Sequence, residues 1–213
     1  MVDFTERTLG AFLDGVAERT PTPGGGGVAA TAGALACSMA RMVAAYSVGK
    51  RTEPENRARI EGISAKLADA DRLMRELITA DAAAYTDMTE AGKARDTGPN
   101  GESRYARAVL TAIGVPMEMA AIASNALTQM DELKFVASKY LISDLGVAAV
   151  LADACARAAR YSVCVNAPEI ADRGTRERLT ANIDRIVGHC LSLKTAVEQT
   201  VDERLKTSGS SDR

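Results

Sequence analysis

Apolar residues recur every three or four positions along most of the chain, which is the spacing that places them on one face of an α-helix. In residues 5–18 this pattern aligns Leu9, Phe12, Leu13 and Val16. A cluster of prolines and glycines follows, and such clusters interrupt helices. The pattern therefore predicts an amphipathic helix over residues 5–18.

A second segment, residues 28–48, carries small residues along its stripe. The stripe consists of Ala29, Gly33, Ala36, Ala40 and Ala44. Small side chains let a neighbouring helix approach closely, so we expect this helix to be buried. Arg41 is its only charged residue, and we expect its side chain to be paired or to reach outward at the rim.

The third periodic segment is long and extends from Thr52 to about residue 90. Thr52 begins a Thr-Glu-Pro-Glu sequence, which has the form of a capping box with a proline in the first turn. Asp81 and Tyr85 continue the apolar face of this segment, one turn apart. Residues 91–101 are rich in glycine and polar residues and predict a surface loop.

The second half of the chain predicts two further helices before the last one. Residues 103–139 are helical in pattern but contain Pro116, which predicts an interruption with a kink. Ser143 or Asp144 is placed to act as the N-cap of a second alanine-rich helix, which extends to about residue 165. We expect this helix to pack against the helix of residues 28–48 through its own small residues.

A loop over residues 166–174 precedes the last predicted helix, residues 175–205, and residues 207–213 predict a disordered tail. Only 4% of the residues are aromatic and none is Trp, which favours closely packed helices over a β-rich fold. A chain of 213 residues can bury one substantial core. We therefore predict a single all-α domain over residues 1–206, a bundle of about six to nine helices.

Charge and cysteine content narrow the classes of function. The formal net charge is −2, from 26 basic and 28 acidic residues, so no basic field is available for nucleic acid. The four cysteines lie far apart and His189 is the only histidine, so we expect no metal site. The start is acidic where an export signal needs basic residues, and no uncharged apolar run is long enough to span a bilayer. We expect a cytoplasmic protein that binds neither nucleic acid nor a membrane.

The candidate binding feature is the run TPTPGGGG, which begins at Thr20 and leads into the helix of residues 28–48. The two prolines keep the first half of this run extended, and the four glycines leave the following turn free of Cβ atoms. Bare N–H groups at the positive end of a helix dipole suit a carboxylate, a phosphate or an electron-rich heterocycle edge. A flexible linker is the alternative. The run is not a known nucleotide-binding loop, because the Lys-Ser/Thr ending and a preceding strand are missing.

Three further places carry groups that could take part in chemistry, and each also has a structural explanation. Lys50 follows a helix end, where the helix dipole alone favours a lysine. Asp81 lies on an apolar helical face, where a carboxylate needs a partner and a structural ion pair would supply one. Ser143 and Asp144 open a helix, where Asp144 could be only an N-cap.

Taken together, these motifs resemble one known family. PTPGGGG is followed by VAATAGALA, VGK, DAAAY, a VP dipeptide, SDLGVA and VNA, in that order. The order and spacing are similar to those of the formiminotransferase-cyclodeaminase C-terminal family, and within it to the stand-alone methenyltetrahydrofolate cyclohydrolases. The resemblance covers residues 9–205.

The resemblance implies an all-helical homodimer that acts on the one-carbon unit of tetrahydrofolate, with no cofactor beyond this folate substrate. A cyclohydrolase adds water to 5,10-methenyltetrahydrofolate and gives 10-formyltetrahydrofolate. A cyclodeaminase instead closes 5-formiminotetrahydrofolate to the methenyl form and releases ammonia. A helical dimer that binds folate without catalysis is a third possibility. A chain without a formiminotransferase half favours the cyclohydrolase, because formimino chemistry benefits from joined sites.

The resemblance also implies the site residues. The implied substrate-binding residues are Pro23, Gly24, Gly25, Gly26, Ser143 and Asn166, and the implied catalytic residues are Asp81, Lys50 and Asp144. Asp81 would act as the base or the electrostatic stabiliser when water attacks an amidinium carbon. Lys50 would hold the water or receive the proton, and Asp144 would bind the donor edge of the pterin. The sequence departs from the family at Gly27 and Tyr85, where many relatives have Ser and Phe.

Overall fold

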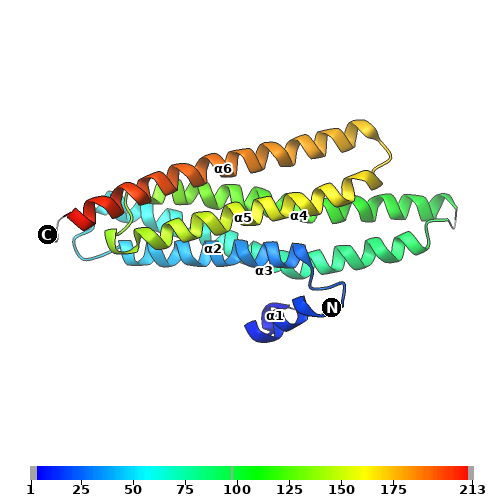
Figure 1. Cartoon of the computed structure of the whole chain (residues 1–213), viewed down its shortest axis with the longest axis horizontal. Helices are drawn as coiled ribbons and strands as arrows, with labels where there is room; N and C mark the ends of the chain where they lie inside the picture. The colour runs from blue at the N-terminus through cyan, green and yellow to red at the C-terminus, as the bar shows by residue number, and fades with distance from the viewer. Residues whose placement is uncertain (1–3, 97, 211–213) are drawn as a thin grey trace.

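The helical periodicity of the sequence forms an all-α bundle in the computed structural model, which describes residues 4–96 and 98–210 (Figure 1). The helices are α1 (Leu9–Ala17), α2 (Gly25–Ser47), α3 (Pro54–Lys93), α4 (Pro99–Leu133), α5 (Ile142–Asn166) and α6 (Arg173–Ser210). Short 3-10 turns are η1 (Phe4–Glu6), η2 (Lys139–Leu141) and η3 (Ala167–Glu169). The six α-helices agree with the predicted fold class, and α1 lies beside the bundle of the other five (Figure 1).

Helix α2 packs against α3 on one side and α5 on the other, which confirms the predicted pairing of the two alanine-rich helices. Gly33 shows why the stripe is made of small residues. A Cβ atom there would lie 2.7 Å from the Met74 sulfur and 2.9 Å from the Cys155 sulfur, closer than packed atoms come. The two helices are antiparallel, and Ser138 N–H donates to Ser47 Oγ at 2.8 Å where α2 ends.

The lone charge of α2 is paired, as predicted. Arg41 Nη1 contacts Asp71 Oδ2 at 3.1 Å, and Arg75 Nε donates to Asp71 Oδ1 at 2.9 Å. Asp71 is only 5% exposed, so its charge needs both partners. The periodic pattern gave no sign of this buried acid, because Asp71 interrupts the apolar face of α3.

The first predicted helix is divided, and most of its apolar face is exposed. The Thr8 hydroxyl oxygen accepts the Ala11 N–H at 3.2 Å and caps α1, so η1 forms a separate turn. Phe12 is buried against Phe4, with their rings edge to face. By contrast, the other large apolar residues of the face lie in solvent, namely Leu9, Leu13 and Val16.

The predicted loop over residues 91–101 is shorter than expected, and the predicted interruption at Pro116 is absent from α4. Helix α3 continues to Lys93 and α4 begins at Pro99, so much of the predicted loop 91–101 is helical. Gly98, with φ +99, makes the turn into α4. Pro116 lies inside α4, which continues through it without interruption.

The predicted boundaries of the last two helices also change. Neither Ser143 nor Asp144 is an N-cap, because Ser138 caps η2 and this turn leads directly into α5 at Ile142. Both predicted caps therefore lie in the first turn of α5. Helix α6 continues to Ser210, so the predicted disordered tail is helical up to that residue, and residues 211–213 lie outside the described residues.

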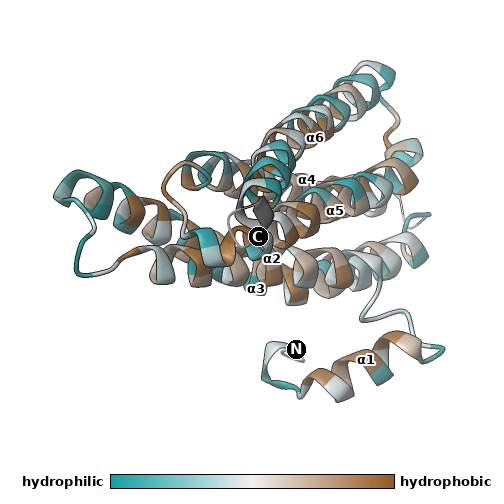
Figure 2. Ribbon diagram, turned by 60° about the vertical axis from the view of Figure 1, so that its left-hand side comes forward, coloured by the Kyte–Doolittle hydropathy of each residue, from teal (hydrophilic) through white to brown (hydrophobic). Residues whose placement is uncertain are grey.

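Two helices are apolar and long enough to cross a membrane by length and composition, α2 and the part of α4 from Asn100. Half of each apolar window is buried inside the bundle, as expected for core helices. In Figure 2 the hydrophobic residues alternate with hydrophilic ones along α6 and along α3, which have one side in solvent.

Candidate active site

The glycine turn forms the start of α2 and not a linker. Helix α2 begins at Gly25, three residues before the predicted start, with Gly24 as the N-cap. Gly26 is buried, and a Cβ atom on it would collide with the Asp81 carboxylate. Glycine at this position therefore lets a carboxylate from α3 approach the first turn of α2.

Asp81 lies at the positive end of the α2 dipole. Its carboxylate accepts the backbone N–H of Gly27, which lowers the pKa of the carboxyl group, but burial raises it more, and the net pKa is above the usual value for Asp. Among the residues that the structure describes, the partner of this partly buried carboxylate is a backbone N–H, and no ion pair with a cation is formed. A carboxylate held in this way can accept a proton more readily than one in water.

A cavity of about 280 Å³ opens beside this turn. It is lined by Pro21, Thr22, Gly24, Gly25, Gly26, Asp81, Ala84, Tyr85, Met88, Ala112, Ser162, Val165 and Asn166. Asn166 comes from the last turn of α5, and its Nδ2 donates to the Ala112 carbonyl in a long bond of 3.5 Å. The fold therefore brings the glycine turn, Asp81 and Asn166 together from three helices.

Some lining residues were not among the predicted ones. Ser162 lies one turn before Asn166 on α5, and Met88 lies two turns after Asp81 on α3, so a helical projection from the predicted residues could have found both. Pro23, which was predicted to contact the substrate, is buried and would contact a Cβ atom on Gly15 or Gly27. Pro23 therefore packs between α1 and the first turn of α2, outside the cavity. Its neighbours Pro21 and Thr22 line the cavity instead.

The other predicted residues lie at the opposite end of the bundle. Lys50 follows the end of α2 and is exposed, and Ser143 and Asp144 occupy the first turn of α5 beside it. The 23 residues of α2 separate this end from the glycine turn by roughly 35 Å. One chain therefore does not bring Lys50, Ser143 and Asp144 to the cavity beside Asp81.

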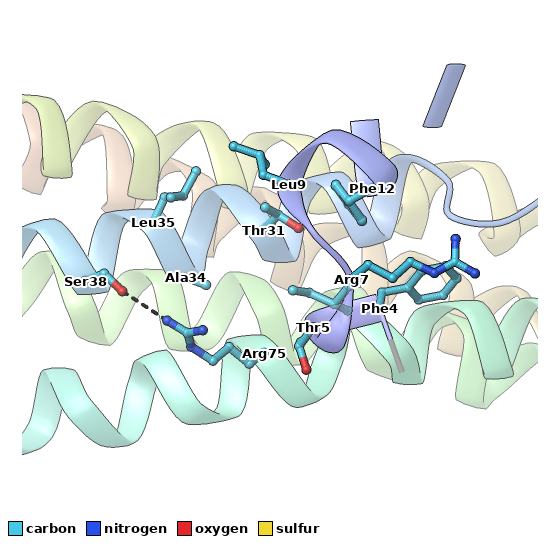
Figure 3. A pocket seen from close by; sticks show the side chains of 11 residues that line it. Phe4, Thr5, Arg7, Leu9, Phe12, Thr31, Ala34, Leu35, Ser38 and Arg75 are labelled. Carbon is cyan, nitrogen blue, oxygen red and sulfur yellow. Dashed lines mark hydrogen bonds between the residues drawn. The ribbon is translucent and has the colours of Figure 1, made fainter. Parts of the chain in front are cut away.

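A second cavity, of about 210 Å³, lies where η1 and α1 cover α2 and α3 (Figure 3). Phe4, Phe12 and Leu9 line one side of it. On the other side Arg75 Nη2 donates to Ser38 Oγ at 3.4 Å. It contains none of the predicted site residues, and two of its polar residues, Ser38 and Arg75, bind each other and Asp71.

Three of the four cysteines are buried in the described part of the chain, and Cys164 is partly exposed. Within the same described residues, no three His, Cys, Asp or Glu residues gather in a way that could hold a metal ion. Burial raises the pKa of Cys37 and Cys155 to about 12 and that of Cys190 to about 11. These thiols are protonated at neutral pH and serve as small packing groups.

Comparison with known proteins agrees with the resemblance seen in the motifs. A family model described as formiminotransferase-cyclodeaminase matches residues 8–185. A methenyltetrahydrofolate cyclohydrolase of Methylorubrum extorquens is 29% identical over 202 residues, which cover 93% of this chain and 97% of that protein. A formimidoyltransferase-cyclodeaminase of Gallus gallus is 28% identical over 85% of this chain, which spans only 34% of that longer protein.

A solved structure shares the whole fold. The crystal structure of a formiminotetrahydrofolate cyclodeaminase from Thermotoga maritima superposes with a TM-score of 0.87 at 26% sequence identity. The match covers 94% of this chain and 98% of that one. The arrangement of helices that forms the cavity is therefore shared with a protein named for folate chemistry.

Proposed function

The chain belongs to the formiminotransferase-cyclodeaminase family, and from this we propose that it is a methenyltetrahydrofolate cyclohydrolase. Family membership makes it a folate enzyme of the cyclohydrolase and cyclodeaminase type. The choice of site rests on the partly buried carboxylate of Asp81, which α3 places in a cavity next to the first turn of α2 and whose pKa is raised. Similarity to a cyclohydrolase over nearly the full length of both proteins supports the choice of reaction.

The proposed reaction begins with water attacking the carbon between N5 and N10 of 5,10-methenyltetrahydrofolate. This carbon belongs to an amidinium cation, so a nearby carboxylate stabilises it before the attack. Asp81 accepts a proton from the water as the new C–O bond forms, which gives a neutral tetrahedral carbon. The C–N5 bond then breaks, the hydroxyl group loses its proton as the C=O bond forms, N5 takes up a proton, and the formyl group stays on N10. One proton is released overall.

The remaining groups of the cavity suit binding. The backbone N–H groups in the first turn of α2 can donate hydrogen bonds to acceptor atoms of the pterin or to a carboxylate of the glutamate tail. Asn166 offers an amide at the α5 side, and Tyr85 offers an aromatic face for stacking on a flat ring. We propose that the folate is the only small molecule required, and that the enzyme is a cytoplasmic homodimer.

The cyclodeaminase reaction is the second candidate, because the solved structure with a TM-score of 0.87 carries that name. In this reaction N10 attacks the 5-formimino carbon and ammonia leaves. Both reactions pass through a tetrahedral carbon next to N5, so Asp81 would assist either. The two differ in whether water or ammonia is exchanged at that carbon.

An assay of the purified protein with both folates separates these functions. We expect the absorbance of 5,10-methenyltetrahydrofolate to fall faster with enzyme than without it, and no ammonia to appear from 5-formiminotetrahydrofolate. Release of ammonia at a comparable rate would replace the cyclohydrolase by the cyclodeaminase. Folate binding without turnover of either substrate would identify a non-catalytic binding protein and contradict the proposal.

A further inference from the structure

A further cavity lies between α3 and α4, away from the glycine turn. Its volume of about 350 Å³ falls within the roughly 300–1,000 Å³ that is typical of small-molecule sites. Each of the two helices contributes four residues at positions i, i+3, i+4 and i+7, which lie on one helical face. We name this cavity the α3–α4 groove, and its lining residues are Lys66, Asp69, Ala70, Leu73, Ile122, Asn125, Ala126 and Gln129.

The α3–α4 groove is separate from the proposed folate site. It shares no lining residue with the cavity beside Asp81. Leu73 is the residue of the groove that lies closest to Asp81 along α3, and the two are separated by more than two helical turns, roughly 12 Å. A ligand in the groove would therefore leave the carboxylate of Asp81 uncovered.

Gln129 is a buried polar side chain on the wall of the groove. It is only 8% exposed, and within residues 4–96 and 98–210 its Oε1 is shielded from solvent and accepts no hydrogen bond. By contrast, Asp71 is buried to a similar degree and is held by Arg41 and Arg75. A buried acceptor without a donor lowers the stability of the fold. A ligand that donates a hydrogen bond would satisfy this oxygen.

The rim of the groove carries one positive and one negative charge. Lys66 and Asp69 are exposed and lie one turn apart on α3. Neither forms an ion pair in the part of the chain that the structure describes. A ligand with a single charge would meet a like charge in this groove, whereas a zwitterion would find an opposite charge for each of its ends.

The groove has a polar end and an apolar end. Helices α3 and α4 follow each other in the chain and pack side by side in antiparallel orientation (Figure 1). The start of one lining segment therefore faces the end of the other. Lys66 lies at the same end as Gln129, and Leu73 lies at the same end as Ile122. This arrangement suits a ligand with a charged head and an apolar tail.

We propose that the α3–α4 groove binds a free α-amino acid with an apolar side chain, a function separate from the folate chemistry. The carboxylate of the amino acid pairs with Lys66 and its ammonium group with Asp69, whose Cβ atoms are roughly 5–6 Å apart at this spacing. Rotation about the last torsion of Gln129 turns its oxygen toward the ammonium group. The exposed amide of Asn125 donates to the carboxylate, and the apolar side chain fills the other end of the groove.

Isothermal titration calorimetry of the wild-type protein tests the inference. Valine, leucine, isoleucine, methionine and phenylalanine are titrated one at a time, and we expect at least one to bind at one site per chain with a Kd of about 1 mM or lower. The amide of that amino acid lacks the carboxylate, and the matching carboxylic acid lacks the ammonium group. Each should bind at least about tenfold more weakly. Binding of none of the five would overturn the inference.

Three variants locate the binding. Gln129→Met keeps the unbranched shape but removes the polar atoms, so we expect binding at least about tenfold weaker and no fall in the thermal unfolding midpoint. Lys66→Met should weaken binding to a similar extent. The matched control is Lys93→Met, which changes another exposed lysine of α3 and should bind like the wild type. Unchanged binding by Gln129→Met would contradict the proposed site.

A competition experiment separates this inference from the proposed function. Saturation with 5-formyltetrahydrofolate should leave the Kd of the amino acid unchanged, because the two ligands occupy different cavities. Competition between them would place the amino acid beside Asp81 and overturn the inference. The calorimetric result does not depend on turnover, so a protein without cyclohydrolase activity that still binds the amino acid would contradict only the proposed function.

Discussion

The two ends of the bundle differ in how far the chain itself prepares them for chemistry. At the glycine end, Asp81 is partly buried, accepts a backbone N–H from Gly27 and has a raised pKa. At the other end, Lys50 is exposed and Ser143 lies at the surface. Charged groups in water have weak effects on a reacting atom, because solvent and salt screen them. One end of the bundle therefore holds a partly buried carboxylate in a cavity, whereas the predicted roles of the exposed groups at the other end stay predictions.

The largest expected effect follows from removing the charge at the prepared end. Asp81→Asn keeps the shape of the side chain but cannot accept the proton, so we expect kcat to fall by at least about a hundredfold. Stopped-flow absorbance of 5,10-methenyltetrahydrofolate measures it. The matched control is Asp87→Asn, which changes an exposed carboxylate on the same helix that pairs with Arg104. A similar loss in both variants would remove the special role of Asp81.

The next effect concerns the exposed apolar stripe of α2, which includes Leu35, Met42 and Tyr46. Leu35 also lines the cavity beneath α1. Leu35→Asp places a charge on this stripe, and we expect the proposed homodimer to give monomers in sedimentation, with activity at least about tenfold lower. Activity should recover partly as protein concentration rises. The control, Ala58→Asp at an exposed position of α3, should sediment and turn over like the wild type. A monomeric Leu35→Asp protein with full activity would show that turnover does not require the dimer.

A smaller effect is the pH dependence of the prepared end. Because burial raises the pKa of Asp81 above 3.8, its base form is lost at a higher pH than for an ordinary Asp. We expect kcat/KM to fall about tenfold per pH unit below this pKa, and the fall to be absent in Asp81→Asn.

The same shift has a consequence for stability. The folded state holds the Asp81 proton more tightly than the unfolded state. The contribution of Asp81 to the free energy of unfolding is therefore present below the unfolded pKa of 3.8 and is lost as pH rises through the raised pKa of the folded state. Urea unfolding of the wild type and Asp81→Asn at several pH values measures the difference. An opposite slope would mean that the Gly27 N–H outweighs burial.

The smallest effect tests the close approach that holds the prepared end together. Gly26→Ala forces the Asp81 carboxylate to move, and we expect a loss of about 1–3 kcal/mol in the free energy of unfolding. Gly62→Ala is the control, since nothing lies within 4 Å of its added Cβ atom. It should raise stability by about 0.4–1 kcal/mol, because alanine reduces the entropy of the unfolded chain. Equal effects in the two variants would mean that Gly26 is not required for contact with Asp81.

Much of the fold could be predicted because helical periodicity is a local property. The alanine stripes predicted the packing of α2 on α5, and Gly33 shows the close contact that makes small residues necessary. Helix ends were less predictable, because they depend on caps that compete. Ser138, and not Ser143, begins the turn before α5, and the Thr52 hydroxyl accepts the Gly49 N–H at 2.8 Å while Glu53 is the N-cap of α3.

The candidate site was predicted only in part, for a geometric reason. Motif order indicates which residues belong together, but the length of α2 alone places Gly24 and Lys50 at opposite ends of one chain. Burial of Asp81 follows from its place on an apolar face, whereas its contact with Gly26 requires the register between α2 and α3. The exposure of Leu9 could not be predicted either, because an apolar helical face indicates burial without indicating what covers it.

A crystal structure with 5-formyltetrahydrofolate, a stable folate that carries a formyl group on N5, would show directly whether the folate binds in the cavity beside Asp81. We predict that the pterin lies against Gly24–Gly26 with the one-carbon unit next to Asp81. A folate bound away from Asp81, for example in the cavity beneath α1 (Figure 3), would contradict the proposed site.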